Sequence, residues 1–258
     1  MRRKSILLFV VLLCSLAYAD EWKREYKVGA KPELRVETND ARIEVRRGGQ
    51  TIQVRVETEG YKIGPGDVHI YDHQDGDAVT VNVRTPNGPF ISFHNRSVHV
   101  EVSVPPNTKL DVHSGDGSVA VSGISAPADI SSGDGRIEVW DFAGPLKART
   151  SDGSMKVSGR FDDLSLSSGD GHIDCEIQAG SRMNGRWSLR TDDGSVNIHL
   201  PQGFAADLQA RTGDGHIRIN LPITMKSSSS EGHRLEGMLN GGGNVLDLQT
   251  GDGSINVN

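Results

Sequence analysis

The sequence predicts an all-β protein, a right-handed parallel β-solenoid with an N-terminal β-rich cap. Three observations predict this fold. An Asp-Gly pair with Ser or Thr two positions before the Asp recurs seven times, apolar and polar residues alternate on both sides of each of these pairs, and the composition is rich in glycine but poor in aromatics. The 258 residues include 31 glycines and only 5% aromatic residues. Such a composition favours a thin core of small aliphatic side chains between many turns.

The Asp-Gly pair is the centre of a sequence repeat. Its first four copies lie 18 residues apart, and the later steps of 23, 21 and 38 residues indicate inserted segments. We expect glycine to supply the positive φ of a tight corner and aspartate to accept hydrogen bonds from the turn. The pairs are Asp116-Gly117, Asp134-Gly135, Asp152-Gly153, Asp170-Gly171, Asp193-Gly194, Asp214-Gly215 and Asp252-Gly253.

Each repeat predicts two short strands on either side of the corner. Aliphatic residues recur four positions before the Asp and three and five positions after it, with polar residues between them. A unit this short cannot bury its apolar face alone, so consecutive units should stack in parallel at ~4.8 Å. Crossovers between parallel strands are right-handed by default. A hydroxyl precedes each Asp by two positions, at Ser114, Ser132, Thr150, Ser168, Thr191, Thr212 and Thr250.

The chain divides into three predicted segments. Residues 1–19 are a signal peptide, residues 20–107 form the β-rich cap with one degenerate repeat around Asp40, and residues 108–258 form the solenoid of seven Asp-Gly repeats. A cap is expected because an open solenoid edge would pair with other chains. The polar, Gly-rich stretch 226–243 is expected to be a loop between the last two repeats.

The signal peptide predicts export to the periplasm or the cell surface. A basic start, an apolar run from Ile6 to Leu13 and the small residues Ala17 and Ala19 fit a secretory signal. The apolar run is too short to remain as a membrane-spanning helix. Leu13 before Cys14 argues against a lipid anchor. We therefore expect no stable insertion in the membrane.

The net charge argues against nucleic acid as a partner, and the cysteine content excludes an internal disulfide. Without the signal peptide, Lys and Arg fall from 28 to 25 against 34 Asp and Glu, which leaves a net charge of −9. An acidic chain without a basic cluster is a poor partner for nucleic acid. Only Cys175 then remains, so no internal disulfide is possible. We expect it to pack inward as an inert thiol.

The repeat resembles that of the bacterial putative-adhesin domain family of unknown function. The similar residues are Val104-Pro105-Pro106-Asn107, the corner pattern from Leu110 to Val121 and the closing segment from Gly237 to Gly253. Membership would imply a β-solenoid at or outside the inner membrane and an adhesin role. The resemblance supplies no catalytic residues.

The corner aspartates have two interpretations, as structural turns or as calcium ligands. The structural one is favoured, with Gly117, Gly135, Gly153, Gly171, Gly194, Gly215 and Gly253 forming the turns. Glycine-rich nine-residue repeats bind Ca²⁺ in β-rolls, and 18 is twice nine. Calcium needs six to eight oxygens, however, and each repeat offers a single Asp corner. The calcium candidates are Asp116, Asp134, Asp152 and Asp170.

Other candidate residues give weaker signals. Arg149, Arg190 and Arg211 share one column, interrupted by Ser167, and would suit a sugar acid or a phosphate. Trp140 and Phe142 would stack on a sugar, whereas Trp187 is expected in the core. His172 and His216 share a column but are too far apart to hold one zinc ion. His69 and His73, near Asp72, Asp75 and Asp77, form a weak metal candidate.

The favoured function is a non-catalytic exported scaffold or adhesin-like binding protein. It would use a solenoid face to contact an envelope protein or a glycan. The hydroxyl column has no His or Lys base at a recurring offset, so no catalytic residues are assigned. Two alternatives remain open, a carbohydrate-active enzyme on a β-helix and a calcium-stabilised β-roll. No cofactor other than calcium is considered.

Overall fold

The computed structural model describes residues 19–86, 96–228 and 232–258. The predicted signal peptide lies outside these residues except for Ala19. The described residues form strands, turns and irregular segments, and the all-β prediction is confirmed. The described part of the chain contains no helix that is long and apolar enough to cross a membrane.

Within these residues 21 strands form one hydrogen-bonded sheet that winds around a narrow core. The strands are β1 (Ala19–Lys27), β2 (Glu33–Thr38), β3 (Arg42–Arg47), β4 (Thr51–Glu59), β5 (His69–Asp75), β6 (Ala78–Arg84), β7 (Ser97–Val104), β8 (Lys109–Ser114), β9 (Val119–Ser122), β10 (Ala128–Ser131), β11 (Ile137–Arg149), β12 (Met155–Ser167), β13 (Ile173–Ile177), β14 (Trp187–Thr191), β15 (Val196–His199), β16 (Ala206–Thr212), β17 (Ile217–Ile219), β18 (Ile223–Ser228), β19 (Arg234–Leu239), β20 (Val245–Thr250) and β21 (Ile255–Val257).

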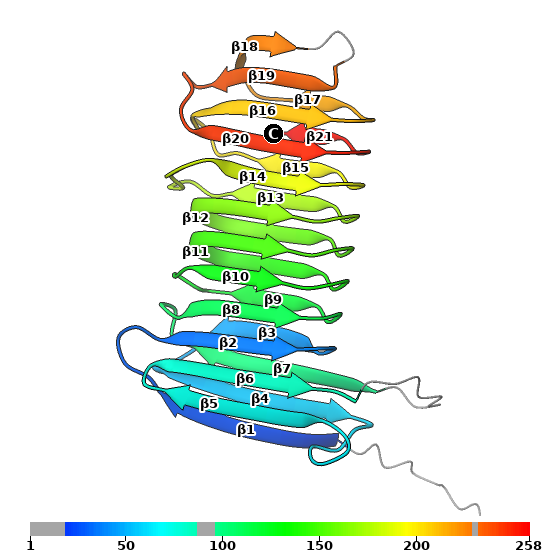
Figure 1. Ribbon diagram of the computed structural model, residues 1–258. Helices are drawn as coiled ribbons and strands as arrows, with labels where there is room; N and C mark the ends of the chain where they lie inside the picture. Colours follow the sequence, from blue (N-terminus) through cyan, green and yellow to red (C-terminus); the bar gives the residue numbers. More distant parts are fainter. Residues whose placement is uncertain (1–18, 87–95, 229–231) are drawn as a thin grey trace, which may run out of the picture.

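The strands lie on two faces, and each coil of the chain contributes one strand to each face (Figure 1). Face 1 has the order β5-β6-β2-β8-β10-β11-β12-β14-β20-β16-β19-β18. Face 2 has the order β1-β4-β7-β3-β9-β11-β12-β13-β15-β21-β17. Strands β11 and β12 are long enough to run through both faces. Pairing is parallel from β6 to β16 and from β7 to β17, and antiparallel beyond. The right-handed sense of the coil stays a prediction.

The repeat predicts that consecutive coils lie next to each other, but at both ends of the array the coils do not stack in the order of the sequence. Strands β2 and β3 of the degenerate repeat pair directly with β8 and β9, so the chain between them folds beyond the repeat at the N-terminal end. Strands β20 and β21 of the last repeat insert between the coil of β14 and β15 and the coil of β16 and β17. Because the sequence pattern is the same in every coil, it determines the register between paired strands but not which coil lies next to which.

Asp247 holds the inserted last repeat in place. Its side chain is 2% exposed on β20, and its Oδ2 accepts hydrogen bonds from Arg186 Nη1 at 3.1 Å and Arg190 Nη2 at 2.9 Å. Gln249 Nε2 donates to the other oxygen at 3.0 Å. A buried carboxylate is costly unless it is paired and hydrogen-bonded. These three partners meet that requirement and tie β20 to its neighbour β14.

The core consists of aliphatic columns and one aromatic column. Val36, Val112, Ile130 and Leu248 are fully buried at equivalent positions of their coils. Phe142, Phe161, Trp187 and Phe204 follow one another through the core, with successive ring centroids 6.0, 6.4 and 5.6 Å apart. Trp187 is buried as expected. Phe142 is 2% exposed, so its proposed stacking on a sugar is wrong.

The corner glycines are needed for close approach between coils, not for positive φ. None of the glycines that follow the corner aspartates has φ in the left-handed region, so that expectation is wrong. A Cβ on Gly153 would lie less than 3.0 Å from the carbonyl oxygen of Gly135 in the next coil. The same contact recurs from Gly117 to Gly253 along the stack. Only glycine therefore allows successive corners to lie at strand spacing.

The hydroxyl column forms a hydrogen-bond ladder along these corners. Thr150 Oγ1 accepts a hydrogen bond from the amide of Gly153 in its own corner at 3.2 Å. It lies 2.8 and 3.2 Å from the carbonyl oxygens of Gly133 and Gly135 in the next coil, to which it donates. Equivalent bonds join Ser114 to Ala41, Ser132 to Gly117, Ser168 to Gly153, Thr191 to Gly171, Thr250 to Gly194 and Thr212 to Gly253.

The segment 226–243 is not a loop, in contrast to the prediction. Its described residues include the end of β18 and all of β19, which pair antiparallel with each other and, through β19, with β16. An unpaired edge of β16 would expose a row of backbone N–H and C=O groups. The hairpin covers this edge, and Leu239 is fully buried beneath it.

Replacing Gly153 with alanine should destabilise the stack. The added Cβ collides with backbone and not with a movable side chain, so we expect a loss of about 1–3 kcal/mol. Urea unfolding followed by circular dichroism measures it. Gly49→Ala is the matched control, since Gly49 has no neighbour within 4 Å and no positive φ. Equal midpoints for the two variants would contradict this account of the corner.

Replacing Thr150 with valine should remove one step of the hydroxyl ladder while keeping the side-chain volume. The amide of Gly153 then loses its acceptor in a site where Thr150 is only 7% exposed, which costs about 1–3 kcal/mol. The neighbouring exposed residue provides the control variant, Ser151→Ala. A shift in the thermal midpoint is expected for the first variant alone, and an unchanged midpoint would refute the ladder's contribution.

Candidate functional site

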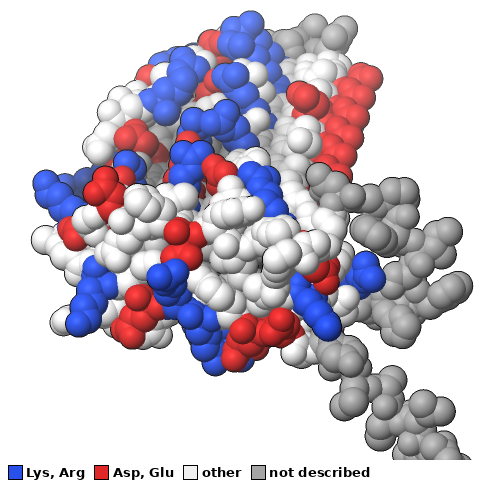
Figure 2. Space-filling model, turned by 60° about the horizontal axis from the view of Figure 1, so that its bottom comes forward, with Lys and Arg blue, Asp and Glu red and all other residues white. Residues whose placement is uncertain are grey.

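The corner aspartates form an exposed row along one edge of the stack. A straight row of acidic side chains follows this edge in Figure 2. Asp116, Asp134, Asp152 and Asp170 are all exposed. Their side chains accept no hydrogen bond from any described residue, so the turn role expected of the carboxylates is wrong. The hydroxyl column accepts the corner amides instead.

This acidic row does not converge on a common point. Neighbouring corners lie one coil apart, at ~4.8 Å, where two carboxylates repel by about 1 kcal/mol even in water. Among the described residues, three ligand atoms come within 4.8 Å of one another only at Glu57, His99 and Glu101, which lie elsewhere. The row thus offers a line of negative charge with one carboxylate for each coil.

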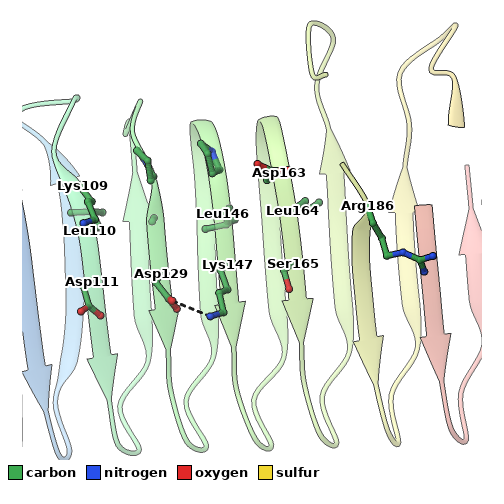
Figure 3. A pocket seen from close by; sticks show the side chains of 13 residues that line it. Lys109, Leu110, Asp111, Asp129, Leu146, Lys147, Asp163, Leu164, Ser165 and Arg186 are labelled. Atoms are coloured by element: carbon green, nitrogen blue, oxygen red, sulfur yellow. Dashed lines mark ion pairs between the residues drawn. The ribbon is translucent and has the colours of Figure 1, made fainter. Parts of the chain in front are cut away.

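A groove on face 1 crosses four successive strands, β8, β10, β11 and β12, and reaches the next coil at Arg186, directly before β14 (Figure 3). It runs along the stack over the first residues of β8 and β10 and over the face 1 segments of β11 and β12. Its apolar lining is accessible at Pro127 and Pro145, whereas Leu110, Leu146 and Leu164 beneath are at most 2% exposed. Charged and hydroxyl side chains line it at Lys109, Asp111, Asp129, Lys147, Asp163, Ser165 and Arg186.

The groove carries both signs of charge in alternation. Lys147 Nζ lies 3.3 Å from Asp129 Oδ2 on the neighbouring strand, and both side chains are 48% exposed. Lys109 is paired with Glu33 at 3.4 Å, outside the groove. Asp163 has no ion-pair partner among the described residues. The lining therefore combines apolar contact with polar groups that remain accessible to a ligand.

The arginine column is interrupted in the structure. Ser167 separates Arg149 from Arg190, and the inserted strand β20 places Gln249 between Arg190 and Arg211. Arg190 is already bonded to Asp247. These residues therefore do not form a continuous anion site.

Trp140 is an exposed aromatic residue on face 2, as its candidate role requires. Its exposed fraction is 43%, and the next residue, Asp141, has a left-handed backbone with φ of 50°. The register of β11 against β12 shifts at this point, because Trp140 and Asp141 together face Ser158. Strand alternation places Trp140 outward beside Ser122 of β9, like Glu138 two residues before it, and the β-bulge after it brings Phe142 back to the inward side.

The remaining candidates do not form reactive groups in the described structure. Burial raises the pKa of the Cys175 thiol, so it stays protonated and inert. His172 and His216 are separated by two intervening coils. Around His69 and His73 the described residues bring no three ligand atoms within 4.8 Å of one another. Asp72 bonds Arg24 and Tyr26 instead, and Asp77 accepts the amide of Gly29.

Sequence reasoning missed the groove, Asp247 and the cluster around His99. The groove depends on the packing of five coils, and each of its residues is ordinary within its own repeat. Asp247 stands in a column of exposed polar residues, and its burial follows from the inserted position of β20. His99 and Glu101 do alternate visibly on one strand, but the partner strand of β7 could not be identified from the pattern.

Comparison with known proteins identifies one family and several solved structures of low sequence identity. The family model of Toastrack DUF4097 matches residues 106–258, and no curated protein matches the chain. Similar solved structures include a putative cell adhesion protein from Clostridium sporogenes, with 12% identity over 92% of this chain and 98% of the other and a TM-score of 0.45. A putative adhesin from Bacteroides fragilis is 11% identical over 92% of this chain and 97% of its own, with a TM-score of 0.43. A putative lipid binding protein from Parabacteroides distasonis is 14% identical over 94% of this chain and 98% of its own, with a TM-score of 0.40.

The matched segment contains every complete Asp-Gly repeat from Asp116 to Asp252, more than half of the chain. The resemblance that the corner pattern suggested is thereby confirmed. The chain belongs to the Toastrack DUF4097 family, a family of domains of unknown function.

Proposed function

We propose that this protein is an exported, non-catalytic scaffold that binds a linear ligand along the groove of face 1. The ligand would be a glycan or an extended segment of an envelope protein. The observation that supports this function is the course of the groove, which crosses β8, β10, β11 and β12 in succession and reaches the fifth coil at Arg186. A site of this shape contacts a polymer at many points and suits binding more than a single reaction.

The dimensions and chemistry of the groove fit such a ligand. Five coils at ~4.8 Å give four intervals and a length of ~19 Å, equal to about six residues of extended peptide. Pro127 and Pro145, which are exposed and half-buried respectively, supply apolar contact to a sugar ring or an aliphatic side chain. Lys109, Asp163 and Ser165 supply donors and acceptors along the rim, which gives specificity through many small contacts.

The acids of the groove are placed for binding and structure. A glycoside hydrolase of the usual kind needs two carboxyl groups on opposite sides of the scissile bond, one of them able to donate a proton. Asp129 is paired with Lys147, and Asp111 lies 3.6 Å from Arg35. The hydroxyls of the corner column are engaged with backbone groups and face inward. These contacts support the non-catalytic proposal over a carbohydrate-active enzyme.

We also propose that the antiparallel ends act as caps of the stack. Beyond the parallel coils, β1 and β5 end the two faces at the N-terminal side, and β18 ends face 1 at the other side. Charged side chains on β1 and β5 discourage pairing with another sheet. The proposed location of the capped scaffold is the periplasm or the cell surface.

Reversing one charge in the groove should weaken binding. Lys147→Glu breaks the pair with Asp129 and adds a negative charge to the rim, so at least tenfold weaker binding is expected. An array of bacterial envelope polysaccharides and peptidoglycan fragments, and a library of extended envelope peptides, provide the ligands. Lys156→Glu, an exposed lysine on face 2, is the control. Loss of binding in the control alone would place the site on the other face.

Chelation should leave the stability of the stack unchanged. The corner aspartates contribute one carboxylate for each coil, far below the six to eight oxygens that calcium prefers. The thermal midpoint of metal-free protein, measured by circular dichroism, should therefore be equal with excess calcium and with EDTA. A large loss of β signal in EDTA would favour the calcium-stabilised β-roll instead.

A further inference from the structure

We propose a binding site for a late first-row divalent metal ion, of the zinc type, formed by Glu57, His99 and Glu101 on face 2. One ligand atom of each side chain lies within 4.8 Å of the other two. The site is on β4 and β7, near the N-terminal end of the stack. It is separate from the groove of face 1 and independent of the function proposed for it.

The strand register brings these three side chains together. His99 on β7 lies directly opposite Glu57 on β4 in the antiparallel pair. Glu101 follows His99 by two residues, so it projects from the same face of the same strand. Directly opposed side chains have Cβ atoms ~5 Å apart, and positions i and i+2 are close neighbours along the strand. Three ligands arranged in this way surround one point above the sheet.

The imidazole of His99 has an unsatisfied nitrogen at this point. Nε2 is shielded from solvent and has no hydrogen-bond partner among the described residues, although the side chain as a whole is 30% exposed. The carboxylate nearest to this nitrogen is Glu44 Oε2 on the neighbouring strand β3, at 3.8 Å, beyond hydrogen-bond distance, and the ligand atoms of Glu57 and Glu101 lie within 4.8 Å of the imidazole. A buried polar atom without a partner costs about 1–3 kcal/mol, and a metal ion bound to Nε2 would remove this cost.

Arg55 orients the two glutamates and leaves each with an unused oxygen. Its Nη2 is paired with Glu57 Oε1, and its Nη1 lies 3.5 Å from Glu101 Oε2. Glu57 Oε2 and Glu101 Oε1 are then available as ligands, and Arg55 holds the carboxylates from behind. Hydrogen-bonded carboxylates of this kind are typical of the outer shell of metal sites.

The site is open to solvent on one side. Glu57 and His99 line a surface hollow together with Glu21, Arg55, Thr58 and Ser97. An ion can enter through this hollow and keep a water molecule as its fourth ligand. Ligands on one tetrahedral zinc ion lie ~3.3 Å apart, and small rotations of the glutamates bring the trio to that spacing.

The donor set selects the class of ion. One imidazole nitrogen and two carboxylates suit zinc and its neighbours, whereas calcium and magnesium prefer oxygen ligands alone.

Isothermal titration of metal-free, untagged protein with zinc chloride tests the site. We expect one ion for each chain, with a dissociation constant in the micromolar range and no competition from an equal concentration of calcium. His99→Ala and Glu101→Gln should each weaken binding at least tenfold, because each removes one ligand. Zinc should raise the thermal midpoint of the unmodified protein and not that of His99→Ala.

Matched controls separate this site from adventitious binding. His199→Ala removes an exposed histidine of face 2, and Glu138→Gln neutralises a glutamate in the same column as Glu101 on another coil. Both controls should bind zinc like the unmodified protein. The proposal is overturned if no zinc binds at micromolar concentration, or if His99→Ala binds as tightly as His199→Ala. Circular dichroism shows whether each variant is folded.

Discussion

The close approach of successive corners is the constraint on which the rest of this structure depends. Each corner glycine lies against a carbonyl oxygen of the next coil, and a single extra carbon there would force the coils apart. The same spacing lets Thr150 and its equivalents bridge two coils at once. It also sets the parallel register of both faces. Small side chains in the core follow from it, because narrow coils leave little room for large ones.

Much of the fold could be predicted from the sequence, and the failures have physical causes. The alternation around Asp116 and its equivalents gave the strands and their inward residues, including Trp187 and Cys175. The stacking order was not predictable, since any coil with the shared register can pair with any other. The strand β19 was missed because its segment is polar and gains its order from the exposed edge of β16. The role of Gly153 was misassigned, because a glycine in a short turn motif is compatible both with a positive φ and with close approach to a neighbouring backbone.

The functional features share a different origin from the repeat. The groove on face 1 and the cluster on face 2 consist of outward-facing residues that differ from coil to coil. The inward columns must keep their size and register for the coils to stack, whereas the outward columns are free to vary. Lys147, Asp163 and Arg186 meet in one groove only because their coils are neighbours in the stack. His99 and Glu57 meet through the antiparallel pairing at the N-terminal end. Local sequence therefore says little about either feature.

The inserted position of the last repeat affects how the chain can reach its final state. A chain made from its N-terminus onward produces β16 and β17 before β20 and β21, the strands that join them to β14 and β15. The coil that contains Asp214 therefore lacks its native neighbour, or pairs transiently with another strand edge, until β20 and β21 have been made. Growth of the array by duplication is also restricted, because a new repeat appended after Asn258 would find no free edge at β21.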